Sequence, residues 1–254
     1  MKGSVVPGSA SAQPPVLRAH AVSVTFGKKD AAVVALDEVD LAIAPASFTV
    51  IMGPSGSGKT TLMSCLSGLL APTRGEVVYG DTGLYALPDH ELSRLRLEHF
   101  GFVFQDYGLL ESLSARGNIL LPARAAGKSV DERRLRGLCE DLGITRYLGM
   151  RPDELSGGTQ QRVACARALI SDPDVIFADE PTGALDSHNA ARIRELLRRI
   201  VDERGISVVT VTHDPQFVEF ADRVLLIRDG RIEQDLVGAT VDQVVASAQQ
   251  RVAM

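Results

Sequence analysis

Residues 53 to 60 read Gly53-Pro54-Ser55-Gly56-Ser57-Gly58-Lys59-Thr60. This order matches the phosphate-binding loop (P-loop) pattern G-x-x-x-x-G-K-[ST]. An apolar run, residues 48–52, precedes the loop and a helical pattern follows it. The glycines let consecutive backbone N–H groups curl around an anion, and the start of the following helix adds the positive end of its dipole. The loop and its flanks therefore predict a site that binds the phosphates of a nucleotide.

The polar residues that end this loop suit nucleotide chemistry. Lys59 is expected to contact the β- and γ-phosphates, and Thr60 to give its hydroxyl to Mg²⁺. The next residue, Thr61, is placed to reach the α-phosphate. A Gly-rich turn that only begins a helix is the simpler alternative. The apolar strand before the loop and the helix after it favour the nucleotide site.

Acidic residues follow a second apolar run, residues 175–178. In a P-loop enzyme the Asp at such a strand end, here Asp179, holds Mg²⁺, usually through water. Glu180 is then placed to orient and polarise an attacking water as a general base. His213 ends another apolar run, residues 208–212, and ligands bind at strand ends in open α/β sheets. We predict that His213 senses the γ-phosphate rather than serving a structural role.

A second Gly-rich stretch, residues 155–162, reads Leu-Ser-Gly-Gly-Thr-Gln-Gln-Arg and precedes a helical run. Ser156 can donate its hydroxyl, while Gly157 and Gly158 allow the backbone to approach an anion closely. One chain does not need two such sites for one nucleotide. A head-to-tail dimer uses both, with each ATP between the P-loop of one chain and the Ser-Gly-Gly helix of the other.

The order of patterns along the chain predicts an α/β fold. Strand patterns at 48–52, 175–178 and 208–212 indicate a mostly parallel core, and mainly helical periodicity at about 89–170 interrupts it, with one short strand at 102–104. We divide the chain into a flexible tail (1–15), one domain (16–238) and a C-terminal helical tail (239–254). Residues 224–233 are expected to form a terminal hairpin around Asp229-Gly230.

Composition excludes several classes of protein. The 254 residues carry 27 Lys and Arg against 32 Asp and Glu, a net charge of −5. This acidic balance, without a block of basic residues, argues against a nucleic-acid partner. No run approaches the roughly 18 apolar residues that span a bilayer, so we expect no membrane crossing by this chain itself. The N-terminal tail lacks a signal-peptide core, which predicts a reducing, cytoplasmic location.

The three cysteines are widely spaced, and each lies in a helical pattern. Their spacing suits neither a disulfide framework nor a zinc site. Cysteines in such positions usually behave as small buried hydrophobic residues. We therefore expect Cys65, Cys139 and Cys165 to be buried and chemically inert.

Taken together, the motifs resemble the nucleotide-binding subunit of ATP-binding cassette (ABC) transporters. The resemblance covers about residues 16–234. The motifs occur in the order of that family: the P-loop, Gln105, Leu155–Gln160, Asp179-Glu180, Ala184-Leu185-Asp186 and His213. It implies a P-loop NTPase core, with a mostly parallel sheet flanked by helices, an antiparallel β subdomain and a helical insert. It also implies ATP and Mg²⁺ as cofactors.

The resemblance assigns further roles. Phe26 occupies the position of the aromatic residue on which adenine stacks, usually Tyr; the alternative for Phe26 is a strand residue of the core. Gln105 resembles the glutamine that touches Mg²⁺ and the attacking water. Asp186 resembles the aspartate that crosses the dimer interface. The implied catalytic set is therefore Glu180, His213, Lys59 and Gln105.

Three stretches, residues 51–59, 101–105 and 181–186, resemble the macrolide-export and lipoprotein-release group of this family. The membrane partners of that group have few spans and a large extracytoplasmic domain, and they work by mechanical transmission. Some positions depart from the group. Ala46-Ser47-Phe48 replaces Gly-Glu-Phe, Gly117 replaces a Glu, and Thr159 replaces a Gln. None of these departures touches the chemistry.

The resemblance implies an ATPase subunit that acts as a homodimer on the cytoplasmic face of the cell membrane and drives a permease. Tyr107, Leu109 and Leu110 are candidates for the surface that docks on the permease, with ordinary packing as the alternative. A signalling complex that activates an external enzyme without transport remains open, because the difference lies in the partner. A soluble ABC ATPase of DNA repair or translation, or a small-molecule kinase, fits the motifs less well.

Overall fold

The apolar run before the P-loop forms a central strand of a six-stranded sheet in the computed structural model, which describes residues 14–27 and 31–249. The strand order is β10-β9-β3-β8-β7-β6. The strands are β3 (Phe48–Met52), β6 (Phe100–Val103), β7 (Val175–Asp179), β8 (Ser207–Val211), β9 (Arg223–Arg228) and β10 (Arg231–Val237). All pairings are parallel except that of β9 with β10. This confirms the mostly parallel core and the terminal hairpin.

Alternate residues of β3 pack into two different cores, as the two-residue period of a strand requires. Phe48, Val50 and Met52 belong to a core shared with the helical elements, whereas Ile51 faces a core shared with the second sheet. Because both faces are covered, all five residues of β3 are buried. This burial explains why the sequence reads as a continuous apolar run instead of an alternating one.

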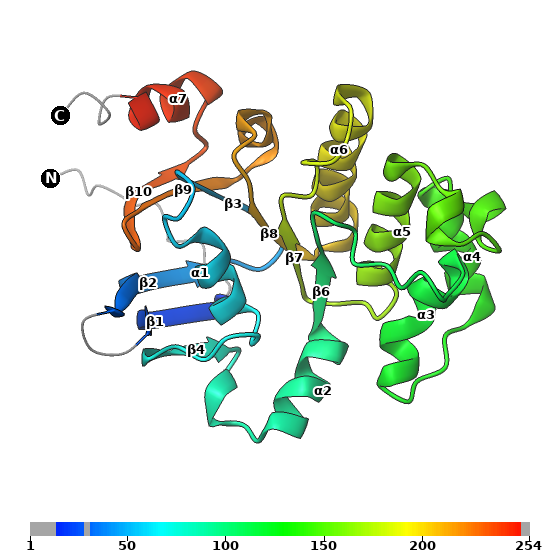
Figure 1. The fold of residues 1–254 in the computed structure, drawn as a ribbon, viewed down its shortest axis with the longest axis horizontal. Coiled ribbons are helices and arrows are strands. Elements are labelled where there is room, and N and C mark those ends of the chain that lie inside the picture. The colour runs from blue at the N-terminus through cyan, green and yellow to red at the C-terminus, as the bar shows by residue number, and fades with distance from the viewer. Residues whose placement is uncertain (1–13, 28–30, 250–254) are drawn as a thin grey trace, which may run out of the picture.

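The second sheet is the antiparallel β subdomain that the family resemblance implies. Its four strands run in the order β2-β1-β4-β5. They are β1 (Leu17–Phe26), β2 (Val33–Ile43), β4 (Arg74–Tyr79) and β5 (Thr82–Gly83). The helix after the P-loop, α1 (Lys59–Leu66), lies beside this sheet in Figure 1 and contributes Leu62 and Leu66 to the core between the two sheets.

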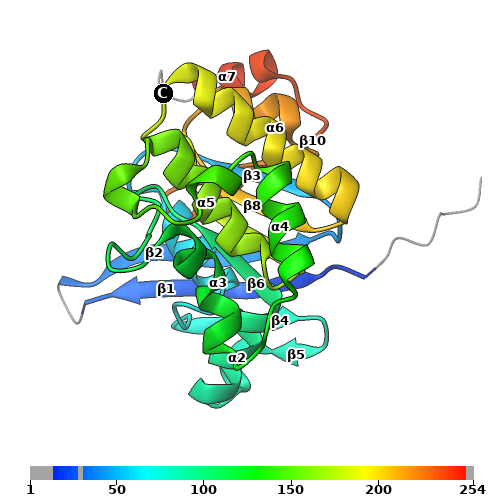
Figure 2. The same ribbon diagram turned by 90° about the vertical axis from the view of Figure 1, so that its right-hand side faces the viewer.

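The remaining helices gather mainly on the other side of the large sheet. They are α2 (Asp89–His99), α3 (Ala115–Ala125), α4 (Glu132–Asp141), α5 (Gly157–Leu169), α6 (Ser187–Arg204) and α7 (Val241–Gln249). Figure 2 shows α3 to α6 in front of the strands, and Figure 1 shows α7 next to β10. Among the described residues, no helix combines the length and apolar character needed to cross a bilayer.

Two predicted element boundaries move by a few residues. The strand expected at 102–104 is β6, Phe100–Val103, because the chain turns at Phe104, whose carbonyl accepts a bond from Tyr107 N at 3.1 Å. The helix after the P-loop ends at Leu66 and does not reach Leu69, since Gly68 adopts φ +73°. Residues 1–13 of the predicted N-terminal tail and 250–254 of the C-terminal tail lie outside the described residues.

The three cysteines are buried and unpaired, as expected. Burial raises the pKa of the Cys65 thiol to about 12 and that of Cys165 to about 12. Burial, with a smaller contribution from Glu132, raises the pKa of Cys139 to about 11. The thiolate is the reactive form, so at neutral pH these side chains act as apolar packing residues.

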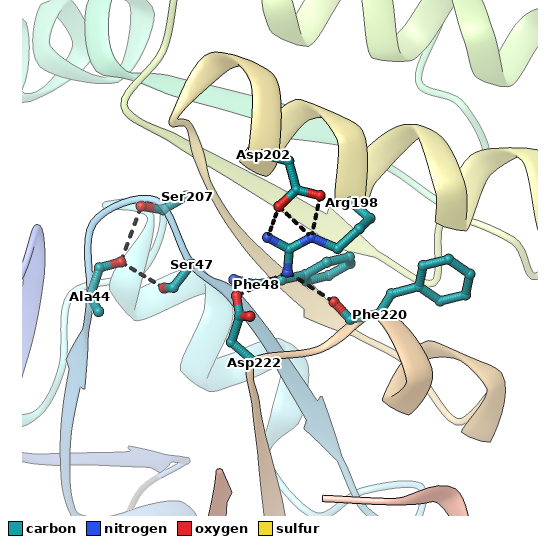
Figure 3. A network of polar contacts seen from close by, with 8 residues as sticks. All are labelled: Ala44, Ser47, Phe48, Arg198, Asp202, Ser207, Phe220 and Asp222. Atoms are coloured by element: carbon teal, nitrogen blue, oxygen red, sulfur yellow. Dashed lines mark hydrogen bonds and ion pairs between the residues drawn. The ribbon is translucent and has the colours of Figure 1, made fainter. Parts of the chain in front are cut away.

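A polar network holds the loop that enters β3 (Figure 3). Phe48 N donates to Asp222 Oδ2 at 2.7 Å, and Arg198 Nη1 on α6 donates to the same oxygen at 3.0 Å. The hydroxyls of Ser47 and Ser207 both donate to the Ala44 carbonyl. The network thus ties the loop before β3 to β8, to α6 and to the segment before β9.

Ala46 lies in this loop with φ +48°, a left-handed conformation that glycine adopts without steric cost. We expect Ala46→Gly to raise the free energy of unfolding by about 1 kcal/mol, because relief of the strain exceeds the entropy that glycine adds to the unfolded chain. Denaturant unfolding measures the change. Ala191→Gly, within α6, is the matched control and should lower the free energy of unfolding by about 0.5–1 kcal/mol. If both variants lowered the free energy of unfolding by the same amount, the backbone strain at Ala46 would be contradicted.

Candidate nucleotide site

Two glycines of the P-loop have no room for a side chain. A Cβ at Gly53 would lie 2.1 Å from the Ile227 carbonyl oxygen, and one at Gly58 would lie 2.4 Å from that of Ala35. Gly58 also adopts φ +101°, which disfavours other residues. The P-loop therefore packs tightly against the hairpin β9–β10 and strand β2. This packing fixes the direction of the backbone N–H groups of the loop.

The groups of the P-loop suit a bound anion. Gly58 caps α1 without a side-chain hydrogen bond, and the first turn of α1 contains no acidic residue. The Ser57 hydroxyl is buried and has no hydrogen-bond partner. The Lys59 ammonium donates to the Pro54 carbonyl at 2.7 Å and so folds back over the loop. Free N–H donors at a helix start, an orphaned hydroxyl and a lysine fit the phosphates of ATP.

Lys59 lies within electrostatic reach of the two carboxylates that end β7. Burial lowers its pKa, and the charges of Glu180 and Asp179 oppose that shift. Burial raises the pKa of Asp179, Glu180 raises it further, and Lys59 lowers it. Two adjacent carboxylates that repel each other fit a site for a hard divalent cation such as Mg²⁺.

Glu180 is held in place from the end of β8. Its Oε2 accepts the Thr212 hydroxyl at 3.0 Å, and its Oε1 accepts His213 N at 3.1 Å. The Nδ1 atom of His213 lies 2.8 Å from the same Oε1. Glu180 has φ +43°, an unfavourable value for a non-glycine residue, and such strain concentrates at functional sites. Three contacts therefore fix the carboxylate that sequence reasoning assigned as the general base.

Exposure differs between the two partners in this contact. The side chain of Glu180 is only 17% exposed, whereas that of His213 is 78% exposed. His213, Gly53 and Pro54 border one pocket of about 410 Å³. The imidazole thus contacts the general-base candidate, lines the same pocket as two P-loop residues and is accessible to a ligand.

Gln105 follows β6 and is exposed. Its side-chain amide packs against the turn after Glu180, since a Cβ at Gly183 would lie 3.2 Å from Gln105 Nε2. Phe26, at the end of β1, is 47% exposed. The alternative that Phe26 is a core residue is therefore wrong, because about half of its surface is accessible to solvent.

The Ser-Gly-Gly segment begins α5 and packs against other parts of the chain. Ser156 is exposed, and its hydroxyl lies 2.9 Å from that of Thr159. A Cβ at Gly157 would lie 2.7 Å from the Tyr107 hydroxyl, and one at Gly158 would lie 2.6 Å from Asn189 Oδ1. Both glycines thus lie in close contact with side chains from other parts of the chain, Tyr107 and Asn189.

Asn189 also contacts the predicted interface aspartate. Asp186 caps α6, accepting Asn189 N at 3.0 Å and Asn189 Nδ2 at 2.6 Å, and these bonds lower its pKa. Sequence reasoning did not single out Asn189. The sequence could have indicated Asn189, because it follows the helix-capping Asp186 by three residues, and side chains at that position often hydrogen-bond to the capping residue.

The structure divides the predicted residues into two groups. The P-loop, Asp179, Glu180 and His213 come together where β3, β7 and β8 end, as expected for parallel strands. Ser156, Gly157 and Gly158 stand on α5, which lies with α3 and α4, whereas α1 lies beside the small sheet (Figure 1). The chain therefore has two separate helix starts suited to anions.

A family model described as "ABC transporter" matches residues 36–183, more than half of the chain. The chain belongs to the ABC transporter family. It is an ABC ATPase cassette, as the motifs predicted.

Curated relatives of this cassette are larger proteins. The macrolide export ATP-binding/permease protein MacB of Marinobacter nauticus is 43% identical over 87% of this chain and 34% of its own length. MacB of Rhodopseudomonas palustris (strain HaA2) is 46% identical over 83% of this chain and 32% of its own length. The resemblance to macrolide-export proteins is confirmed, and the chain spans about a third of these relatives.

Solved ABC cassettes share the fold. The dimeric structure of MJ0796, described as a bacterial ABC transporter cassette, has a TM-score of 0.81 and 36% identity, covering 88% of this chain and 99% of that one. A second structure of the same protein, a dimeric post-hydrolysis state bound to ADP and Pi, has a TM-score of 0.80 at the same identity and coverage. The predicted P-loop NTPase fold is confirmed.

Proposed function

We propose that this chain is the ATP-hydrolysing subunit of a membrane transporter, and that it works as a head-to-tail homodimer coupled to a permease. The observation that carries the proposal is the cluster of Lys59, Asp179, Glu180 and His213 at the ends of three adjacent strands. In domain terms, residues 16–238 form the ATPase with a helical subdomain at about 89–170. Residues 239–254 form a C-terminal tail.

Each residue of the site has a role in hydrolysis. The P-loop N–H groups, Lys59 and Thr61 bind the phosphates, and Phe26 stacks on the adenine. Thr60, Asp179 and Gln105 would hold Mg²⁺, which when bound neutralises charge on the phosphates. Glu180 accepts a proton from the attacking water, and His213, fixed by Glu180, contacts the γ-phosphate.

A dimer explains the second helix start. Ser156 is exposed in the single chain, and α5 begins there without a side-chain cap on its backbone. The solved MJ0796 cassette is dimeric, which supports the same assembly here. Each ATP then lies between the P-loop of one chain and Ser156, Gly157 and Gly158 of the other, with Asp186 at the interface.

A permease partner is supported by the relatives, which are named ATP-binding/permease proteins. Of the three candidate docking residues, Tyr107 packs against Gly157 and Leu109 against the core, while Leu110 is 48% exposed. Beside this segment, a groove of about 380 Å³ between α2, β6, α3 and α5 exposes Phe104 and Leu121. We place the permease, with a large extracytoplasmic domain, on this surface at the cytoplasmic face of the membrane.

Affinity capture from detergent-solubilised native membranes tests the partner. The bait is Glu180→Gln protein with Mg-ATP, and mass spectrometry identifies what co-purifies. We expect a permease with few spans and a large external domain, and its loss when Leu110→Asp is added to the bait. Ser129→Asp, an exposed change between α3 and α4, is the control that should keep the partner. Recovery of ribosomes, nucleic acid or only soluble proteins would contradict the transport function.

A further inference from the structure

Arg194 is a buried cation to which the hydrolysis scheme gives no role. It lies on α6, and its side chain is only 7% exposed. Nη1 donates to Asp214 Oδ2 at 2.8 Å, Nη2 donates to Gln216 Oε1, and the guanidinium lies 5.9 Å from the centre of the Phe217 ring. All three partners belong to the segment that immediately follows His213. Arg194 therefore anchors residues 214–217 to α6.

Residues 214–217 are joined to the carboxylate of Glu180 by a short chain of hydrogen bonds. Asp214 N donates to Thr212 Oγ1 at 3.1 Å, and the Thr212 hydroxyl donates to Glu180 Oε2 at 3.0 Å. His213 stands between Thr212 and Asp214 and contacts Glu180 Oε1. Asp214 is therefore connected to Glu180 through Thr212 by two hydrogen bonds and to His213 through the backbone.

The same helix begins at the proposed dimer interface. Asp186 caps α6, and Asn189 in its first turn packs against Gly158 of the Ser-Gly-Gly segment. Arg194 follows Asp186 by eight residues, about 12 Å along the helix axis. One rigid helix thus contacts the interface at one end and the His213 segment part-way along.

We propose that Arg194 is a positioning residue that sets the placement of His213 and Glu180 through Asp214, and that α6 links this placement to the dimer interface. The proposal rests on the proposed roles of His213 and Glu180 in ATP hydrolysis. Arg194 contacts Asp214, Gln216 and Phe217 and is not among the residues assigned above to the nucleotide or the attacking water. Its guanidinium donates to Asp214 and Gln216 at the same time, so it restrains two side chains of this segment where a single hydrogen bond would restrain one.

The ion pair of Arg194 with Asp214 is largely buried, and it is better explained by a positioning role than by a contribution to stability. Taking a guanidinium out of water is costly, and a buried ion pair often contributes little net stability compared with apolar residues. Arg194 Nε is buried and has no hydrogen-bond partner, so the side chain is not even fully satisfied. Fixing the His213 segment is the benefit that accounts for this cost.

Steady-state ATPase kinetics of Arg194→Met test the proposal, with Arg204→Met as the matched control. Arg204 lies on the same helix and pairs with Asp141 at 2.8 Å, away from the site. We expect Arg194→Met to lower kcat about tenfold or more, with KM changed less than about threefold, because misplacing a catalytic group slows the chemical step. Arg204→Met should keep the wild-type kcat.

The same substitution in a His213→Ala background separates positioning from a general loss of structure. Because Arg194 acts partly through His213 and partly through Thr212 and Glu180, the further loss of kcat should be clearly smaller than the loss in the wild-type background, since residues that act as a unit are not additive. Arg194→Met/Asp214→Asn removes both charges together, keeps a side-chain oxygen that can accept the bond from Gln216 N, and is expected to fold even where the single variant does not. It should show the same low kcat.

Two results would overturn the positioning role. One is a wild-type kcat in folded Arg194→Met or in the paired variant. The other is an equal loss of kcat from Arg194→Met in the wild-type and His213→Ala backgrounds. If Glu180→Gln and His213→Ala themselves keep wild-type turnover, the proposed function fails and the positioning role with it. If they lose turnover while Arg194→Met does not, only the positioning role fails.

Discussion

Glu180→Gln is expected to lower the kcat for ATP hydrolysis by about a hundredfold or more, because the amide cannot accept the proton of the attacking water. The substitution keeps the size of the side chain and a carbonyl oxygen that can accept the bond from His213 N. Lys59 and the P-loop are unchanged, so ATP binding should remain. Phosphate release measures turnover, and fluorescence of a labelled nucleotide measures binding.

Glu195→Gln is the control for this substitution, because Glu195 is an exposed carboxylate on α6. It should turn over ATP like the wild type. Substantial hydrolysis by Glu180→Gln would remove Glu180 as the general base. Loss of both binding and hydrolysis would instead show that its contacts to Thr212 and His213 hold the site together.

Ser156→Arg is expected to abolish ATP turnover while leaving nucleotide binding to the monomer nearly intact. Ser156 is exposed at the start of α5, next to Gly157 and Gly158. An arginine there would occupy the volume between this helix start and the P-loop of the second chain. The P-loop of the same chain lies before α1 and is separate from the start of α5. Binding of ATP to a single chain should therefore not change.

Ser129→Arg adds the same side chain at an exposed position between α3 and α4 and serves as the control. It should keep full turnover. Normal hydrolysis by Ser156→Arg would mean that one chain completes the site alone. Loss of nucleotide binding to the Ser156→Arg monomer would equally contradict a site shared between two chains.

Contiguous motifs made much of the site predictable from sequence. The P-loop, Asp179-Glu180 and the strands that precede them are local patterns, because parallel buried strands read as apolar runs and their carboxyl ends meet at one edge. The same logic placed His213 at this edge of the sheet, and the structure adds its 2.8 Å contact with Glu180. Phe26 was left open between adenine stacking and the core, and only its exposure excludes the core.

Contacts between distant parts of the sequence were not predictable. Tyr107 was a candidate docking residue, yet its hydroxyl packs on Gly157, fifty residues later in the chain. Asn189 and Arg194 belong to an ordinary amphipathic pattern, and their partners Gly158 and Asp214 become neighbours only when α6 packs. Helix periodicity tells which face is buried, but not which polar group a buried arginine meets.

The head-to-tail shared site is the central claim, and the mass of the Glu180→Gln protein in solution tests it most directly. Multi-angle light scattering with Mg-ATP should give twice the 27.2 kDa mass of the chain, and with ADP the mass of one chain. Adding Ser156→Arg should return the ATP-bound protein to a monomer. A Glu180→Gln protein that binds ATP but stays monomeric, or a dimer that Ser156→Arg leaves intact, would contradict the shared site.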